Sequence, residues 1–72
     1  MKLSTVINKA SMVFATVPVA GCGVSIQISK PMARKAVADF LTYTSDEDGN
    51  FYDGLDNTIG WYDQPNNQLY IG

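Results

Sequence analysis

Apolar residues in the N-terminal segment recur at steps of three and four, which is the spacing of one face of a helix. The residues concerned are Leu3, Val6, Ile7, Ala10, Val13, Phe14 and Val17. With Ser4 available as an N-cap and Pro18 as a terminator, the pattern predicts a helix over residues 4–17. The stretch is also rich in β-branched side chains, so residues 12–17 are equally consistent with a strand. Helix and strand both remain open for this segment.

A turn and a strand are predicted next. Residues 20–23 (AGCG) are typical of a turn because two glycines lie within four positions. Aliphatic and polar residues then alternate strictly: Val24, Ser25, Ile26, Gln27, Ile28 and Ser29. A period of two is that of a strand with one face on the core, so we expect a half-buried strand over residues 24–29.

The signals for a helix begin at Ser29. Its hydroxyl can cap the first turn, and Pro31 suits a position inside that turn. An apolar stripe at helical spacing follows, formed by Ala33, Ala36, Val37, Phe40 and Leu41. Because the charged residues fall largely on the other side, we predict a helix over residues 29–43.

The C-terminal segment is predicted to form a β-hairpin over residues 58–71, after a polar, acidic loop over residues 44–57. Its turn lies at residues 64–67 (QPNN). Pro65 suits a type I turn, and Asn67 can take the left-handed conformation that closes a three-residue loop.

This loop length fixes the pairing of the hairpin. It pairs Trp61 with Ile71 and Tyr62 with Tyr70. One face then carries Ile59, Trp61, Leu69 and Ile71. Both tyrosines lie on the other face, which we take as the candidate binding face.

Together these elements predict a single α+β domain over residues 1–72. A small antiparallel sheet, made of the strand near 24–29 and the hairpin 58–71, would pack on the helix at 29–43. Residues 4–17 would add a second helix if they are helical. Because a chain of this length buries only about 60% of the surface that its unfolded form exposes, the core is expected to be small.

Missing residue types exclude most catalytic designs. The chain has no histidine and a single cysteine, Cys22. This composition excludes Ser-His-Asp and Cys-His catalysis, an internal disulfide and a thiolate zinc site. Neither a Walker-type phosphate loop nor a GxGxxG motif is present. We therefore predict a non-enzymatic protein without metal or cofactor, and we expect it in the cytoplasm because small secreted domains usually carry several disulfides.

Charge and aromatic residues divide the chain into two halves. All five basic residues precede Ala36 and all seven acidic residues follow it, for a net charge of -2. Seven of the eight aromatic residues also lie in the later half. Because Tyr and Trp dominate interface energetics and carboxylates attract basic partners, the later half is the candidate binding surface.

The leading hypothesis is a protein-binding domain, an inhibitor or adaptor, that covers a basic surface of its partner. The candidate contact residues are Tyr52, Asp53, Asp56, Tyr62, Asp63 and Tyr70. Since nucleic-acid-binding proteins carry basic surfaces, an acidic face can block one by imitating phosphate. A phage or mobile-element inhibitor, anti-defence proteins included, fits this size and composition. Direct nucleic-acid binding is not expected, because the acidic half would repel the phosphate backbone.

Two alternatives belong to other classes. Residues 19–22 (VAGC) resemble the cleavage box of bacterial lipoproteins, preceded by two lysines and an apolar run. The resemblance implies an envelope lipoprotein cut before Cys22 and anchored by lipid on that residue. The other alternative is a structural or assembly subunit that self-associates, since an open sheet edge invites pairing between copies.

Two further features have structural interpretations that we prefer. Asp46, Asp48 and Asn50 resemble the opening of an EF-hand calcium loop, but Phe51 and Asn57 replace the glycine and glutamate that the loop requires. We therefore predict a solvated acidic loop. Nothing near Cys22 lowers the pKa of its thiol, and we expect it to be a small buried side chain.

Overall fold

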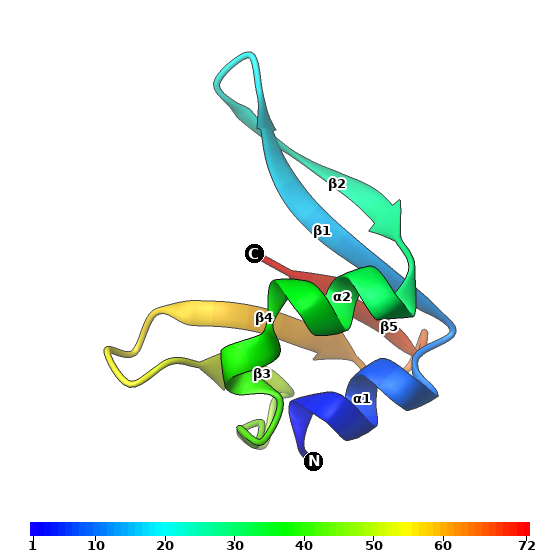
Figure 1. Ribbon diagram of the computed structural model, residues 1–72, viewed down its shortest axis with the longest axis vertical. Helices are drawn as coiled ribbons and strands as arrows, with labels where there is room; N and C mark the ends of the chain where they lie inside the picture. Colours follow the sequence, from blue (N-terminus) through cyan, green and yellow to red (C-terminus); the bar gives the residue numbers. More distant parts are fainter.

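The computed structural model describes all residues 1–72 and contains a five-stranded mixed sheet with two short α-helices (Figure 1). The elements are α1 (Leu3–Lys9), β1 (Met12–Val19), β2 (Cys22–Ile28), α2 (Lys30–Ala36), a 3-10 turn η1 (Ala38–Phe40), β3 (Asn50–Tyr52), β4 (Thr58–Asp63) and β5 (Gln68–Ile71). The strand order is β2-β1-β5-β4-β3. The predicted α+β class is confirmed. The predicted sheet was too small and wholly antiparallel, whereas β1 and β5 pair in parallel.

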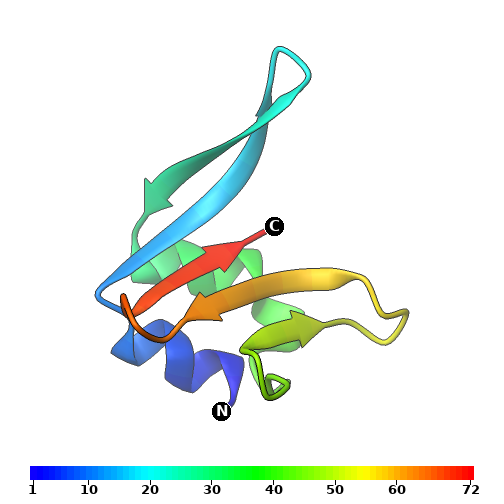
Figure 2. The ribbon, with the colours of Figure 1, turned by 180° about the vertical axis from the view of Figure 1, so that it is seen from behind.

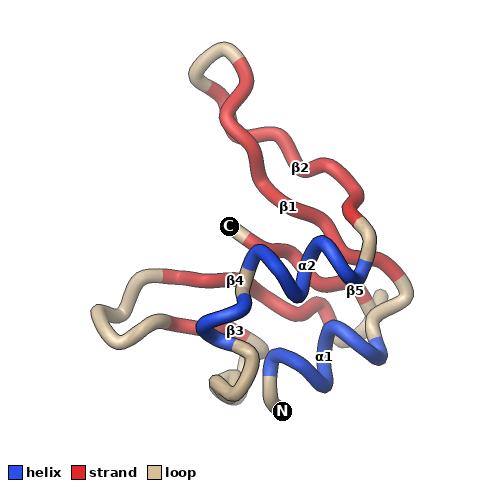
Figure 3. The backbone as a smooth tube through the Cα atoms, viewed as in Figure 1, coloured by secondary structure: helices blue, strands red, loops and turns tan.

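Both helices lie on the same face of the sheet, and the other face carries no helix (Figure 2). The β1–β2 hairpin extends beyond the helices, so its tip stands away from the rest of the molecule (Figure 3). We call this hairpin, residues 12–28, the arm. The arrangement leaves three surfaces: a helix-covered face, a bare sheet face and the arm.

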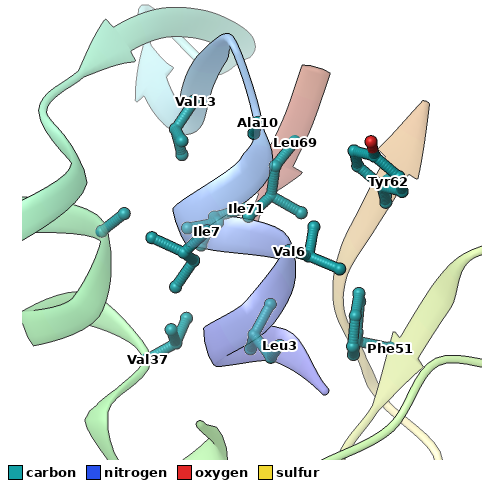
Figure 4. Close-up of a cluster of buried hydrophobic side chains, with 11 residues drawn as sticks. Leu3, Val6, Ile7, Ala10, Val13, Val37, Phe51, Tyr62, Leu69 and Ile71 are labelled. Atoms are coloured by element: carbon teal, nitrogen blue, oxygen red, sulfur yellow. The ribbon is translucent and has the colours of Figure 1, made fainter. Parts of the chain in front are cut away.

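The core lies between the helices and the sheet (Figure 4). Its eleven buried residues are Leu3, Val6, Ile7, Ala10, Val13, Ala33, Val37, Phe51, Tyr62, Leu69 and Ile71. Helix α1 supplies its whole apolar face, at steps of three and four, to this cluster. No buried side-chain nitrogen or oxygen lacks a hydrogen-bond partner, so the core carries no unpaired polar side chain.

The predicted helix over residues 4–17 is correct only for its first half. The chain leaves the helix at Ala10, whose backbone is extended, and the alternative of a strand over residues 12–17 is the correct one. The backbone N–H of Ser11 donates to the Asn67 carbonyl (2.8 Å), which directs the chain into β1. The β-branched residues of this segment favour a strand, and β1 pairs with a neighbouring strand on each side.

The predicted strand at 24–29 is confirmed as β2, but it is not half-buried. Val24 is 41% and Ile26 46% exposed, because the helices do not reach this part of the arm. The turn is confined to Ala20 and Gly21, both with positive φ (51° and 81°). Cys22 begins the strand and is exposed, so its predicted burial is wrong.

The predicted helix over residues 29–43 begins as expected and ends early. The Ser29 hydroxyl accepts from the Met32 backbone N–H (3.3 Å), as an N-cap should. At Val37 the backbone leaves the helical region (φ -117°, ψ 31°), and the helix gives way to η1. This change of direction allows Phe40 and Leu41 to pack against the core.

The C-terminal hairpin is confirmed, but its predicted register is wrong by one residue. Trp61 pairs with Tyr70, and Tyr62 pairs with Leu69. The loop between Asp63 and Gln68 has four residues instead of three, although Asn67 does take the left-handed conformation (φ 52°). Tyr62 consequently faces the core, and Trp61 faces outward.

Candidate functional site

Three aromatic side chains form a stack across the bare face of the sheet. Phe14 on β1 lies opposite Tyr70 on β5, which lies opposite Trp61 on β4. The ring centroids of Phe14 and Tyr70 are 5.3 Å apart with an interplanar angle of 17°, and those of Tyr70 and Trp61 are 5.7 Å apart at 21°. We call these three residues the aromatic row.

Strand alternation sets the direction of the row. Val13, Leu69 and Tyr62 are buried on the helix side. Their neighbours along the strands, Phe14, Tyr70 and Trp61, therefore point to the bare face. Hydrogen bonds hold two of the rings: the Trp61 indole N–H donates to the Asp48 carbonyl (3.2 Å) and the Tyr70 hydroxyl to Gln68 Oε1 (3.0 Å). The stacking and these two hydrogen bonds hold the rings in place, so the row is an ordered aromatic surface.

The positions around the row carry little charge. By their pairing, the outward residues beside it are Met12, Thr16, Ser25, Gln27, Asn50, Asp63 and Gln68. Asp63 is the single charged residue among them. An apolar, aromatic centre with polar neighbours is the composition of a protein interface core.

Two five-residue loops of the same design flank β3. Each begins with an aspartate whose Oδ1 accepts from backbone N–H groups two and four residues ahead. These distances are 2.9 and 2.9 Å for Asp46, and 2.8 and 3.0 Å for Asp53. An asparagine in the fifth position, Asn50 or Asn57, donates to the same carboxylate. We call these the Asp loops, residues 46–50 and 53–57.

The fourth position of each Asp loop has positive φ: 88° at Gly49 and 63° at Asp56. Glycine is required in the first loop, because a Cβ at Gly49 would lie 2.7 Å from the Tyr62 carbonyl oxygen. The first Asp loop is thus tightly packed on β4.

Asp46 uses its carboxylate to order the loop, and no group of three or more metal-ligating side chains is present. The calcium-loop resemblance therefore reflects turn chemistry.

The hydrogen bonds of the Asp loops lower the pKa of two carboxyls. The Asn50 backbone N–H is the largest cause for Asp46, and the Asn57 backbone N–H is the largest cause for Asp53. Both side chains consequently keep their negative charge to a lower pH than an aspartate with the ordinary pKa of 3.8. The β3–β4 end of the sheet carries most of the acidic residues: Asp46, Glu47, Asp48, Asp53, Asp56 and Asp63.

An open depression of about 220 Å³ lies between the first Asp loop and the β4–β5 loop. Its lining includes the acidic run Asp46, Glu47 and Asp48 on one side and Pro65 on the other. Trp61 borders it as well. The indole therefore links the aromatic row to the acidic end of the sheet.

The structure disperses the six predicted contact residues. Tyr70 belongs to the aromatic row, and Tyr52, 40% exposed, lies next to Asp53 and Asp56 of the second Asp loop. Asp63 accepts from the Asn66 amide (2.8 Å).

Tyr62 is only 5% exposed, and its hydroxyl donates to Asn67 Oδ1, so the predicted face shared by Tyr62 and Tyr70 does not exist. Sequence reasoning missed Phe14 and Trp61 as surface residues. The correct hairpin register would have revealed Trp61. Phe14 depends on the parallel β1–β5 pairing, for which the sequence has no local signal.

Comparison with known proteins leaves the site to be interpreted on its own geometry. The chain matches no protein-family model, and searches of curated proteins and of solved structures find no match. Neither helix has the length and apolarity that a bilayer crossing requires.

The VAGC sequence that resembles a lipoprotein box lies at the tip of the arm, with Ala20 and Gly21 in the turn. Cleavage before Cys22 would remove both α1 and β1. The segment before Cys22 contributes five of the eleven core residues: Leu3, Val6, Ile7, Ala10 and Val13.

Proposed function

We propose that this protein is a non-enzymatic protein-binding domain whose contact surface is the bare sheet face, centred on the aromatic row. The observation that carries the proposal is the stack of Phe14, Tyr70 and Trp61 on a face that nothing in the chain covers. Aromatic residues are enriched and charges depleted at the centres of protein interfaces, which matches this face.

The row is suited to binding because it is already ordered. Two of its three rings are hydrogen-bonded and each ring is stacked on a neighbour, so little side-chain freedom remains to be lost when a partner docks. Trp61 is still 40% exposed. It offers the largest unburied aromatic surface of the row and is the expected energetic centre.

The acidic end of the sheet defines the class of partner. Asp46, Glu47 and Asp48 line the depression that Trp61 borders, and Asp63 lies two residues further along β4. Asp53 and Asp56 add charge in the loop between β3 and β4. We propose a partner with a basic surface, which the Asp loops attract and orient while the row supplies the buried contact. Free nucleic acid is not the proposed ligand, because the bare face has no Lys or Arg to neutralise phosphate.

This function would operate by occlusion. A domain of 72 residues that covers a basic, nucleic-acid-binding surface acts as an inhibitor, and one that brings such a protein to another acts as an adaptor. The cytoplasmic location and the phage or mobile-element, anti-defence setting are parts of this proposal that rest on size and composition.

Capture from a cell lysate on the immobilised protein, at about 0.05 M and about 0.5 M salt, tests the proposal. The variants compared are Trp61→Ala and Met32→Ala, the latter removing an exposed apolar side chain (58%) on the helix side. We expect a basic protein that binds the wild type and Met32→Ala at low salt, and at least tenfold less of it on Trp61→Ala. Equal retention on all three, or no retention at low salt, would refute the proposal.

A further inference from the structure

The arm has a composition unlike the rest of the molecule. From Ala10 to Ser29 the chain contains no charged side chain, and Lys9 and Lys30 stand just outside this stretch. The distal part of the arm extends past both helices (Figures 1 and 3). Its side chains therefore remain on the surface although they would suit a core.

One face of the arm is aliphatic and uncovered. Val17 pairs with Val24 and Ala15 with Ile26, which places these side chains on the face that the helices cover at the base of the arm. Further out there is no helix, and Val19, Val24 and Ile26 are 52%, 41% and 46% exposed.

The outer edge of the arm is also unprotected. Strand β2 is the outermost strand and pairs only with β1. Over seven residues it contains no proline, no charge and no irregularity in register, which are the usual defences of an edge strand. In a hairpin with a two-residue turn, Cys22, Val24 and Ile26 direct their backbone groups toward β1. Gly23, Ser25 and Gln27 direct theirs to the open edge.

We propose that the arm binds a second copy of this chain through antiparallel pairing of the two β2 edges, about a twofold axis at Ser25. Ser25 would lie opposite Ser25 of the partner subunit, and Gly23 opposite Gln27 of the partner subunit. All three facing pairs use backbone groups that point to the open edge. Each pair can exchange two hydrogen bonds.

This register also joins the aliphatic faces. Val24 would lie opposite Ile26 of the partner subunit, and Ile26 opposite Val24 of the partner subunit, so four aliphatic side chains meet on one face. A typical interface covers about 800 Å² per partner, roughly one sixth of the 4619 Å² surface of this chain. The arm lies within the longest stretch of the chain without a charged residue, from Ala10 to Ser29.

The absence of charge favours a second copy over a different partner. A twofold contact brings residues near the axis close to their own copies, so a charged residue there would lie near its own like charge. The arm has none, whereas a partner recognised through charge would find nothing to bind there. This inference is independent of the proposed function, because the aromatic row lies on the other face of the sheet.

Sedimentation equilibrium tests the dimer. The wild type is expected at twice the 7.9 kDa chain mass, and Ile26→Lys is expected as a monomer because it places two lysines beside the twofold axis. Thr16→Lys is the matched control: it adds the same charge to the same arm, on the opposite face of β1, and should remain a dimer. A wild type that stays monomeric up to about 1 mM, or an Ile26→Lys variant that stays dimeric, would overturn the proposal.

Disulfide trapping tests the register. The paired Ser25 Cα atoms should be about 5.5 Å apart, within the range of a disulfide, so the double variant Cys22→Ser/Ser25→Cys should form a covalent dimer on mild oxidation. The wild type carries an equally accessible thiol at Cys22, but the two copies would lie about 20 Å apart and should not cross-link. Cross-linking through Cys22 and not through position 25 would contradict this pairing.

Binding at the aromatic row and pairing of the arms are separable. Trp61→Ala should reduce partner capture at least tenfold and leave the dimer intact. Ile26→Lys should abolish the dimer and leave partner capture at the wild-type level. Loss of both properties in either single variant would contradict the assignment of two distinct surfaces.

Discussion

Single aspartates organise the acidic end of this molecule. Asp46 and Asp53 each bind two backbone N–H groups and one asparagine amide, which turns a flexible polar stretch into two ordered loops around β3. The same hydrogen bonds lower the pKa of both carboxyls below the ordinary value of 3.8. The same hydrogen bonds therefore order the two loops and keep these two carboxyls ionised to a lower pH.

The pH dependence of folding should follow from these two carboxyls. Their pKa is lower in the folded than in the unfolded protein, so the stabilisation is complete above pH 3.8 and is lost as the pH falls through the folded values. We expect the melting temperature to fall below about pH 4 and the double variant Asp46→Asn/Asp53→Asn to flatten this decline. Thermal unfolding between pH 2 and 6 measures it.

Glu47→Gln is the matched control for this experiment, since the Glu47 carboxylate makes no hydrogen bond in the first Asp loop. Its acid limb should retain the wild-type slope. An unchanged slope in the Asp46→Asn/Asp53→Asn variant would show that the Asp loops do not govern acid stability.

At the scale of elements, the β4–β5 loop connects the hairpin to α1. Asn67 accepts from the buried Tyr62 hydroxyl, and its amide donates to the Lys9 carbonyl (2.9 Å). Its own carbonyl accepts from the Ser11 backbone N–H (2.8 Å) and hydroxyl (2.9 Å). One loop residue thus fixes both the end of α1 and the start of β1.

Replacing Asn67 should therefore cost more than a turn substitution usually does. Asn67→Gly keeps the left-handed backbone but leaves the Tyr62 hydroxyl unpaired, and we expect a loss of about 1–3 kcal/mol. Asn66→Gly, which removes only an exposed bond to Asp63, should cost less than about 0.5 kcal/mol. Urea denaturation compares them, and equal losses would contradict this role of Asn67.

The same loop shows how far the sequence could predict the elements. Alternation and turn residues correctly indicated β2, the cap at Ser29 and the C-terminal hairpin, because these signals act over a few residues. The hairpin register depends on one residue of loop length, and a loop of four residues reverses the faces of Trp61 and Tyr62. Turn chemistry alone could not distinguish the two lengths.

At the scale of the whole molecule, the decisive strand pairing is the one most distant in sequence. Strand β1 pairs with β5 in parallel, joining Met12 to Gln68 and Phe14 to Tyr70. The hydrophobic pattern of a strand does not show which distant strand pairs with it in parallel. The sequence could therefore predict the α+β class, but it could predict neither the strand order nor the aromatic row. Both helices cover one face of the sheet, and the aromatic row lies on the other face.

The emission of Trp61, the only tryptophan in the chain, tests the central claim most directly. The captured basic protein, or a segment of it without tryptophan, is titrated into the domain at low salt. Because Trp61 lies at the exposed end of the row, docking should shift its emission to shorter wavelength in proportion to binding, and the shift should weaken as salt increases. Saturable binding with no change in Trp61 emission would contradict the claim that the aromatic row is the contact surface.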